Sequence, residues 1–144
     1  MRERISRHQR DRAARVPGLV TVEEPLALAQ AMRRFGDGNT LVLVDCLTLW
    51  LTNLRMPGQQ DASGPPEAVQ DETAAVALLL EAMDAARGPL VLVGNEIGLG
   101  VIPLGAQVRA FVDALGRLNQ EVAQRCARVT LMAAGLPLVL KESA

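Results

Sequence analysis

The sequence predicts an α/β fold, with a mostly parallel sheet and helices on both of its faces, and three observations support this. Short apolar runs at 40–44 and 89–93 alternate with longer segments of helical periodicity. Both runs are continuously apolar, which is typical of parallel strands buried on two sides. The order strand, helix, strand, helix, strand then favours parallel pairing through helical crossovers.

Turn-forming residues divide the first part of the chain. A polar helix is expected over 1–14, and the Pro-Gly pair at 17–18 stops it. A short strand is expected over 19–22. Pro25 follows two glutamates and begins an apolar helical pattern, which predicts a helix that ends near Gly36.

The same signals organise the rest of the chain. A turn at 37–39, made of Asp, Gly and Asn, precedes the first buried strand. Apolar residues at helical spacing mark the helices, and Pro, Gly, Ser and Gln mark a surface loop. The remaining expected elements are helices over 47–54, 67–86 and 105–125, a loop over 56–66, and strands over 40–44, 89–93, 128–133 and 136–141, the last two separated by a turn at Gly135.

Composition narrows the class of protein. Apolar residues make up 49% of the 144 residues, so we expect one domain over 1–144 with a hydrophobic core. Aromatic residues at 2% and a net charge of −1 argue against nucleic acid as a partner. No apolar run approaches the roughly 20 residues of a membrane span, and the charged N-terminus lacks a signal-peptide core. With Cys46 and Cys126 expected to be reduced, packed thiols, we expect a cytoplasmic protein.

Two carboxylates follow the two clearest strands. Asp45 ends the run 40–44, and Glu96 follows 89–93 in a loop that also holds Gly98 and Gly100. Ligands bind at the carboxyl edge of open α/β sheets, so this layout predicts a nucleotide site. Each residue has a structural alternative: Asp45 as the N-cap of the next helix, and the glycines as residues of a turn that needs positive φ.

The usual device for holding a triphosphate is missing. The motif G-x-x-x-x-G-K-[S/T] does not occur, and Lys141 is the only lysine. The chain also opens at Met1 inside a helical pattern with no N-cap residue before it. Either the fold is not of the P-loop type, or the chain begins after the phosphate loop.

Five segments, taken in order, carry a family resemblance. They are 4–8 (RISRH), 21–26 (TVEEPL), 44–54 (VDCLTLWLTNL), 95–103 (NEIGLGVIP) and 109–120 (RAFVDALGRLNQ). Together they resemble the bifunctional adenosylcobinamide kinase / adenosylcobinamide-phosphate guanylyltransferase family of cobalamin synthesis. The resemblance implies a P-loop NTPase-like fold whose first strand, phosphate loop and first helix precede Met1, so the chain is a truncated member or starts at an internal methionine.

The family's chemistry is implied by the same resemblance. It comprises phosphorylation of a hydroxyl of adenosylcobinamide, then GMP transfer from GTP onto that phosphate through a guanylylated histidine. The implied small molecules are ATP, GTP, Mg²⁺, adenosylcobinamide and its phosphate. The implied assembly is a homo-oligomer, a trimer, with no nucleic-acid or membrane partner.

His8 is the only histidine and therefore the expected nucleophile. On a helix, Arg4 and Arg12 lie one turn to either side of it. Their charges disfavour imidazolium, which leaves the ring nucleophilic near neutral pH, and they attract a triphosphate. The alternative is a solvated histidine on an arginine-rich surface helix.

The resemblance assigns further residues to the site. Gln9, Arg10, Asp11 and Arg12 match the guanine-nucleotide segment in position, although Ala13 and Leu19 stand where the family usually has Pro and Trp. Glu23 is expected to contact nucleotide, or else to complement a helix dipole. Asp45 is also the expected Mg²⁺ residue, through water, and Glu96 is expected to act in the site.

Other polar residues have structural interpretations. Thr48 and Asn53 are expected to cap or turn, Arg109 and Asp113 to pair, and Lys141 to be exposed. Gly116 inside a helix predicts close packing, for example between subunits.

Without a phosphate loop, we expect the kinase step to be absent or severely weakened, because electrostatic cradling supplies most of phosphoryl-transfer catalysis. Guanylylation of His8 is expected to fail as well if the same loop is what holds the GTP phosphates. Two alternatives stay open: a non-catalytic nucleotide-binding or assembly module, and an inactive fragment with an open sheet edge.

Overall fold

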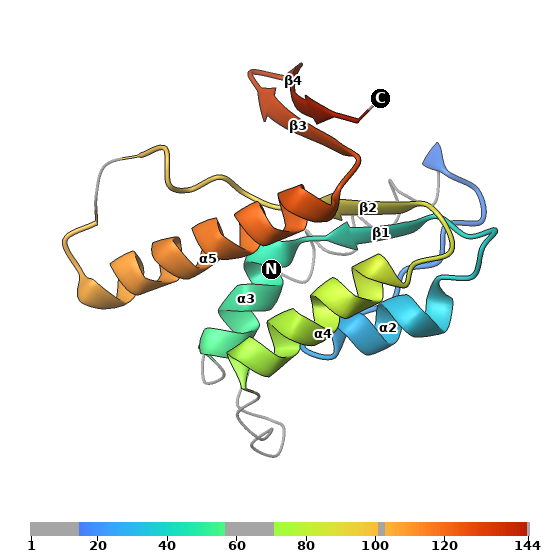
Figure 1. Cartoon of the computed structure of the whole chain (residues 1–144), viewed down its shortest axis with the longest axis horizontal. Helices are drawn as coiled ribbons and strands as arrows, with labels where there is room; N and C mark the ends of the chain where they lie inside the picture. Colours follow the sequence, from blue (N-terminus) through green and yellow to red (C-terminus); the bar gives the residue numbers. More distant parts are fainter. Residues whose placement is uncertain (1–14, 57–70, 101–102, 144) are drawn as a thin grey trace.

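The computed structural model describes residues 15–56, 71–100 and 103–143 (Figure 1). In these residues every expected helix is present, and so are four of the five expected strands. The elements are α2 (Leu28–Phe35), β1 (Val42–Asp45), α3 (Leu47–Arg55), α4 (Glu72–Asp84), β2 (Leu90–Val93), α5 (Ala106–Arg125), β3 (Arg128–Ala133) and β4 (Leu136–Glu142). The helix expected over 1–14 and the loop over 57–66 lie outside the described residues.

The strands form two separate sheets, so the expected parallel sheet is confirmed for β1 and β2, whereas β3 and β4 do not join it. β1 and β2 pair in parallel, with Val42 opposite Leu90. β3 and β4 form an antiparallel hairpin that projects from the helical body (Figure 1). Ala134 and Gly135 both have positive φ, 52° and 78°. A two-residue turn of this kind folds the second strand back on the first.

The strand expected over 19–22 does not form. Gly18, with φ of 87°, makes a turn in which the Leu19 amide donates to the Val16 carbonyl at 3.2 Å. The following residues are irregular, and Val20 is 79% exposed. Since a strand is stabilised by hydrogen bonds to a neighbour, β-branched residues alone do not create one.

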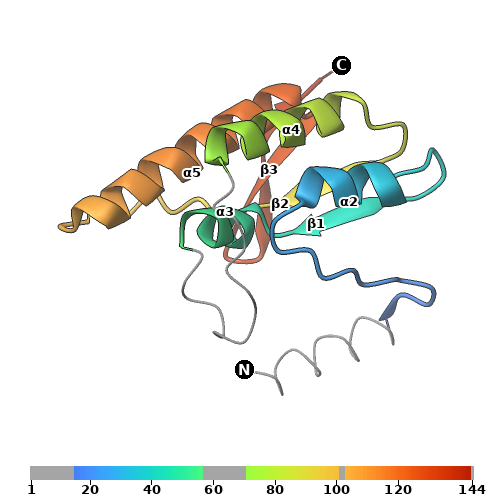
Figure 2. The same cartoon turned by 90° about the horizontal axis from the view of Figure 1, so that it is seen from below.

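Only one face of the parallel sheet is covered by the described residues, so the expectation of helices on both faces was wrong for this part of the chain. Val42, Val44 and Leu92 pack against the helical core. On the other face Leu43 is 52% exposed and Val91 is 45% exposed. Figures 1 and 2 show α2, α3, α4 and α5 gathered against the strands, and Figure 1 shows the hairpin apart from them.

The core lies between the helices and this inner sheet face. The fully buried leucines Leu51, Leu79 and Leu115 come from α3, α4 and α5 respectively. Trp50 is 4% exposed, and its indole Nε1 donates to the Leu26 carbonyl at 2.9 Å. Four helices therefore share one core and fix the sheet edges that carry the polar loops.

Two helices begin later than expected, each next to a carboxylate that accepts backbone amides; that of Asp71 is a true N-cap, whereas the N-cap of α2 is Ala27, without a side-chain cap. The Glu24 carboxylate accepts from the amides of Leu26 and Ala27, so the chain turns here and α2 begins at Leu28. Asp71 is the N-cap of α4 and accepts from the Thr73 amide at 3.0 Å. Such caps satisfy amides that the first turn leaves unpaired.

Candidate nucleotide site at the carboxyl edge of the parallel sheet

Asp45 and Glu96 lie at the same edge of the β1–β2 sheet, as the sequence predicted. Asp45 is the last residue of β1 and stands opposite Val93, the last residue of β2. Glu96 follows Val93 by three positions. Asp45 is exposed, and the N-cap of α3 is Cys46, so the capping alternative for Asp45 is wrong.

A hydrogen-bond network holds the loop that carries Glu96. The Asn95 amide donates to Thr48 Oγ1 at 2.9 Å. From the other side, Asn119 Nδ2 donates to the Asn95 carbonyl at 3.2 Å and to Glu96 Oε2 at 3.3 Å. Thr48 belongs to α3 and Asn119 to α5, so two helices fix the loop after β2.

The glycines of this loop allow polar side-chain atoms to approach the backbone closely, and they are not needed for a strained backbone conformation. A Cβ on Gly94 would lie 3.3 Å from Asn119 Oδ1, and one on Gly98 would lie 3.4 Å from Glu96 Oε1. Neither glycine has positive φ. The alternative of a turn that needs positive φ at Gly98 and Gly100 is therefore wrong, and the glycines leave room for neighbouring polar atoms.

Of the other predicted site residues, the structure describes only Glu23. Glu23 is exposed in the segment before Pro25. Its neighbour Glu24, rather than Glu23, supplies the carboxylate at the start of α2. The nucleophile His8 and its neighbours lie outside the described residues, as do all other members of the predicted guanine-nucleotide segment: Gln9, Arg10, Asp11 and Arg12.

Sequence reasoning missed two members of this edge, Asn119 and Thr48. We expected Thr48 to be structural and assigned Asn119 no role. The side chain of Asn119 reaches a loop more than twenty positions away, which helical periodicity cannot reveal. One usable signal was available: both residues are polar, on helices that flank the strand-end loops where ligands bind.

The described residues contain no group of three or more His, Cys, Asp or Glu side chains able to hold a metal ion. Mg²⁺ in nucleotide sites is commonly bound by one or two carboxylates, with phosphate oxygens and water completing its shell. The exposed carboxylate of Asp45 meets the requirement for one such carboxylate. It would hold the ion directly or through water.

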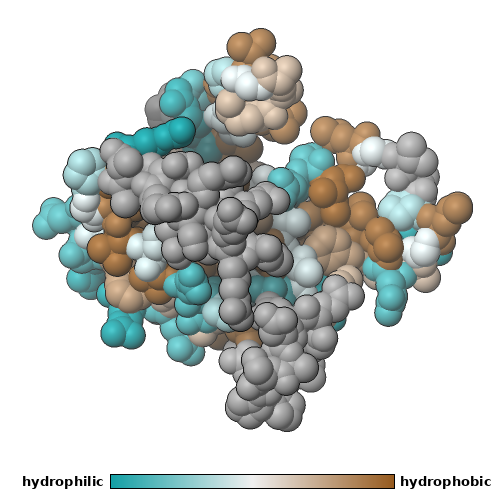
Figure 3. Space-filling model, turned by 180° about the vertical axis from the view of Figure 1, so that it is seen from behind, coloured by the Kyte–Doolittle hydropathy of each residue, from teal (hydrophilic) through white to brown (hydrophobic). Residues whose placement is uncertain are grey.

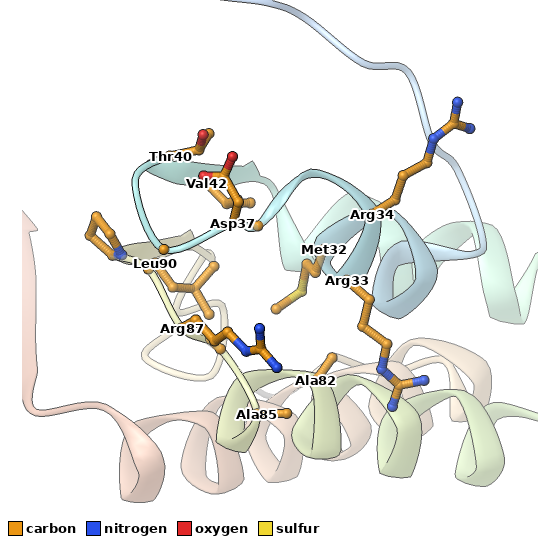
Figure 4. A pocket seen from close by; sticks show the side chains of 15 residues that line it. Met32, Arg33, Arg34, Asp37, Thr40, Val42, Ala82, Ala85, Arg87 and Leu90 are labelled. Carbon is orange, nitrogen blue, oxygen red and sulfur yellow. The ribbon is translucent and has the colours of Figure 1, made fainter.

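A hollow lies at the opposite end of the strands from the Asp45–Glu96 edge (Figure 4). Its volume is about 480 Å³, and its lining includes Arg33, Asp37 and Arg87. The C-terminal ends of α2 and α4 meet here, where carbonyl groups favour nearby cations. Arg33 also pairs with Glu81 at 3.5 Å. The arginines of this hollow thus have a structural explanation in the helix ends.

Several remaining polar residues act as braces. Arg109 donates to the carbonyls of Pro103 and Leu104, so the expected pairing with Asp113 was wrong. Lys141, expected to be exposed, is half-buried and donates to two carbonyls at the end of α5. Such a cation stabilises a helix C-terminus.

The two cysteines agree with the expectation of free, packed thiols. Cys46 and Cys126 are both unpaired and half-buried. Burial raises the pKa of the Cys126 thiol, while the charge of Lys141 opposes that rise.

Comparison with known proteins identifies the family. The model of the family described as cobinamide kinase / cobinamide phosphate guanyltransferase matches residues 1–140. The chain belongs to this family. It is 45% identical, over 98% of its length and 75% of the relative's, to the bifunctional adenosylcobalamin biosynthesis protein CobP of Pseudomonas aeruginosa. It is 29% identical, over 96% of its length and 79% of the relative's, to the bifunctional protein CobU of Escherichia coli.

Family membership makes this chain a relative of bifunctional enzymes that combine kinase and guanyltransferase activities in adenosylcobalamin biosynthesis. The resemblance stated from five short segments is thereby confirmed. None of the helices in the described ranges has the length and apolar character needed to span a bilayer.

Proposed function

We propose that this chain transfers GMP from GTP to adenosylcobinamide phosphate through a guanylylated His8, and that its kinase activity is absent or severely weakened. The family match over residues 1–140 is the observation that carries this proposal. The match spans the only histidine of the chain, whereas the G-x-x-x-x-G-K-[S/T] motif does not occur in its sequence. The given sequence therefore contains the proposed nucleophile but not the motif of the loop that cradles phosphates in kinases.

The transfer takes place in two balanced steps. A ring nitrogen of His8 attacks the α-phosphorus of GTP, a P–N bond forms, the α–β P–O bond breaks, and pyrophosphate leaves with the bonding electrons. A phosphate oxygen of adenosylcobinamide phosphate then attacks the same phosphorus. The P–N bond breaks, a phosphoanhydride forms, and the imidazole is released.

The other site residues take supporting roles in this proposal. Gln9, Arg10, Asp11 and Arg12 bind the guanine nucleotide, and the arginines stabilise charge that develops on the phosphates. Glu23 contacts the nucleotide. Asp45 would hold Mg²⁺, which supplies charge neutralisation at the phosphates when bound. Glu96 contacts ligand from the neighbouring strand end.

The architecture is proposed to be P-loop NTPase-like, with residues 1–144 belonging to a single nucleotide-binding domain. The outer face of the β1–β2 sheet supports this, because Leu43 and Val91 are exposed there. A βα unit of the family on that face would bury them. We also propose assembly as a homo-oligomer, a trimer by family resemblance, and action in the cytoplasm.

Labelling with GTP that carries radioactive α-phosphorus tests the transfer. We expect the chain to retain label after denaturation, in an acid-labile bond, because phosphoramidates hydrolyse in acid. The variant His8→Ala should retain none, and adenosylcobinamide phosphate should discharge the label. Equal labelling of the variant would contradict the proposed nucleophile.

A separate assay tests the lost kinase step. With ATP and adenosylcobinamide, we expect no phosphorylated product above background, while the Pseudomonas aeruginosa relative serves as the positive control. Turnover comparable to the control would show that the phosphate loop is dispensable.

The open sheet face also favours a second candidate, a non-catalytic nucleotide-binding or assembly module. Such a module would bind GTP reversibly and leave His8 unlabelled. An inactive fragment would neither bind nor take up label. The labelling experiment, joined to a binding measurement, separates these outcomes.

A further inference from the structure

The loop that carries Glu96 is fixed more firmly than its exposed position requires. Thr48 accepts the amide of Asn95 at 2.9 Å, and Asn119 bonds the carbonyl of the same residue at 3.2 Å. Residue 95 is thereby held by both of its backbone polar groups. The next residue, Glu96, starts from a fixed backbone position.

The Asn119 amide also fixes the direction of the carboxylate. Its Nδ2 lies 3.3 Å from Glu96 Oε2 and donates a hydrogen bond to it. Among the described residues, the Asn119 amide is the donor to the Glu96 carboxylate. The amide is neutral, so it orients the carboxylate without cancelling its charge. Oε1 is on the side of Gly98, where the missing side chain leaves space.

Asn119 is not needed to hold α5 in place. The helix packs through Ala114, Leu115, Leu118 and Val122, all buried in the shared core. Asn119 itself is only half-buried, at the sheet edge. A polar side chain that contributes little to helix packing, yet bonds two consecutive loop residues, is placed to serve the loop.

A charged carboxylate in this position favours contact with hydrogen-bond donors of a ligand over contact with its phosphates. It repels phosphate oxygens, and it accepts strongly from neutral N–H and O–H donors. The ligands of the proposed function carry two such groups: the N1–H and N2–H edge of guanine, and the hydroxyl and amide groups of the corrinoid.

We propose that Asn119 is a positioning residue that presents the Glu96 carboxylate to N–H or O–H donors of the bound ligand. This proposal rests on the proposed function, since it needs a guanine nucleotide or a corrinoid at this edge. Asn119 acts only through Glu96 and makes no contact with ligand itself.

A double-mutant cycle tests the proposal with the full chain. The dissociation constants for GTP and for adenosylcobinamide are measured by calorimetry for the unaltered chain, Asn119→Ala, Glu96→Gln and the double variant. Gln120→Ala is the matched control, because Gln120 is the exposed neighbour on the same helix. Urea unfolding of every variant checks that the fold is kept.

Glu96→Gln should weaken the binding of one of the two ligands about tenfold or more, which is the usual effect of losing a hydrogen bond to a charged group. Asn119→Ala should weaken the same ligand by a smaller factor. The double variant should match Glu96→Gln alone, because a residue that acts through another adds nothing once its target is gone. Gln120→Ala should change neither constant.

The measurements with GTP and with adenosylcobinamide identify which ligand donates to Glu96. If guanine is the ligand, Glu96→Gln should weaken the binding of GTP and should strengthen the binding of XTP relative to that of GTP. The reason is that the amide of glutamine donates to the xanthine carbonyl. If the corrinoid is the ligand, only adenosylcobinamide binding should fall.

Three results would overturn the proposal. Unchanged binding in Glu96→Gln would refute it while leaving the proposed function intact. Additive effects in the double variant would show that Asn119 acts independently of Glu96. Failure of the unaltered chain to bind either ligand would overturn the proposed function and this inference together.

Discussion

At the scale of single residues, the glycines show how the space around a backbone decides the effect of a methyl group. A Cβ on Gly116 in α5 would meet nothing within 4 Å. The close packing that the sequence suggested for this glycine is therefore not made within the described residues. A Cβ on Gly88 would lie 2.4 Å from the Asp37 carbonyl oxygen, which no real contact permits.

We predict opposite effects for alanine at these two positions. Gly116→Ala should raise the free energy of unfolding by about 0.5–1 kcal/mol, because alanine restricts the unfolded chain and favours the helix. Gly88→Ala should lower it by about 1–3 kcal/mol through the backbone shift that the clash forces. Urea denaturation followed by circular dichroism measures both. A destabilising Gly116→Ala would point to a partner subunit packed on that face.

At the scale of elements, Arg55 joins three helices. Its guanidinium makes two bonds to Glu72, at 2.5 and 3.1 Å, and a third to the carbonyl of Ala110 at 2.8 Å. Arg55 ends α3, Glu72 begins α4, and Ala110 belongs to α5. A forked arginine fixes geometry in a way that a single exposed pair does not.

Arg55→Met should therefore destabilise the fold by about 1–2 kcal/mol, since it leaves the half-buried Glu72 carboxylate without its donor. The matched control is Arg33→Met, which breaks the exposed pair with Glu81. That change should cost no more than about 0.5 kcal/mol. Equal unfolding midpoints for the two variants would show that Arg55 is not a brace.

The sequence predicted the kinds of elements well and their surroundings less well. Helical periodicity located α3 and α5 to within a residue or two of their ends. The apolar run at 40–44 correctly predicted β1, but not which face of it would be covered. Burial depends on segments distant in the sequence. A run of branched apolar residues therefore predicts a strand but not which segments will pack against it.

The candidate site divides in the same way. Asp45 and Glu96 followed from a rule about strand ends, which is local in sequence. Asn119 did not, because its bonds to Asn95 and Glu96 depend on how α5 packs against the sheet. His8 remains a prediction from the family resemblance.

At the scale of the whole molecule, exposed hydrophobic side chains occur in several places, among them the projecting hairpin. Figure 3 shows them at its tip, above a surface that mixes hydrophobic and hydrophilic residues. Met132, Leu136 and Leu138 are all more than half exposed. Monomeric proteins seldom leave such a group open to water.

We predict that copies of this chain associate through the hairpin. Light scattering with size exclusion should give a mass above that of one chain, and Leu138→Lys should shift it toward the monomer. Thr130→Lys places the same charge at an exposed polar position of β3 and serves as the control. A monomer at micromolar concentration for the unaltered chain would contradict the prediction.

The single tryptophan has a consequence for optical work on this protein. Trp50 lies in α3, yet its indole is tied to Leu26, just before α2. The chain has no tyrosine, so nearly all of its near-ultraviolet signal arises from one ring. Fluorescence therefore reports the junction between α3 and the start of α2, and remains silent about the sheet edge where Glu96 is held.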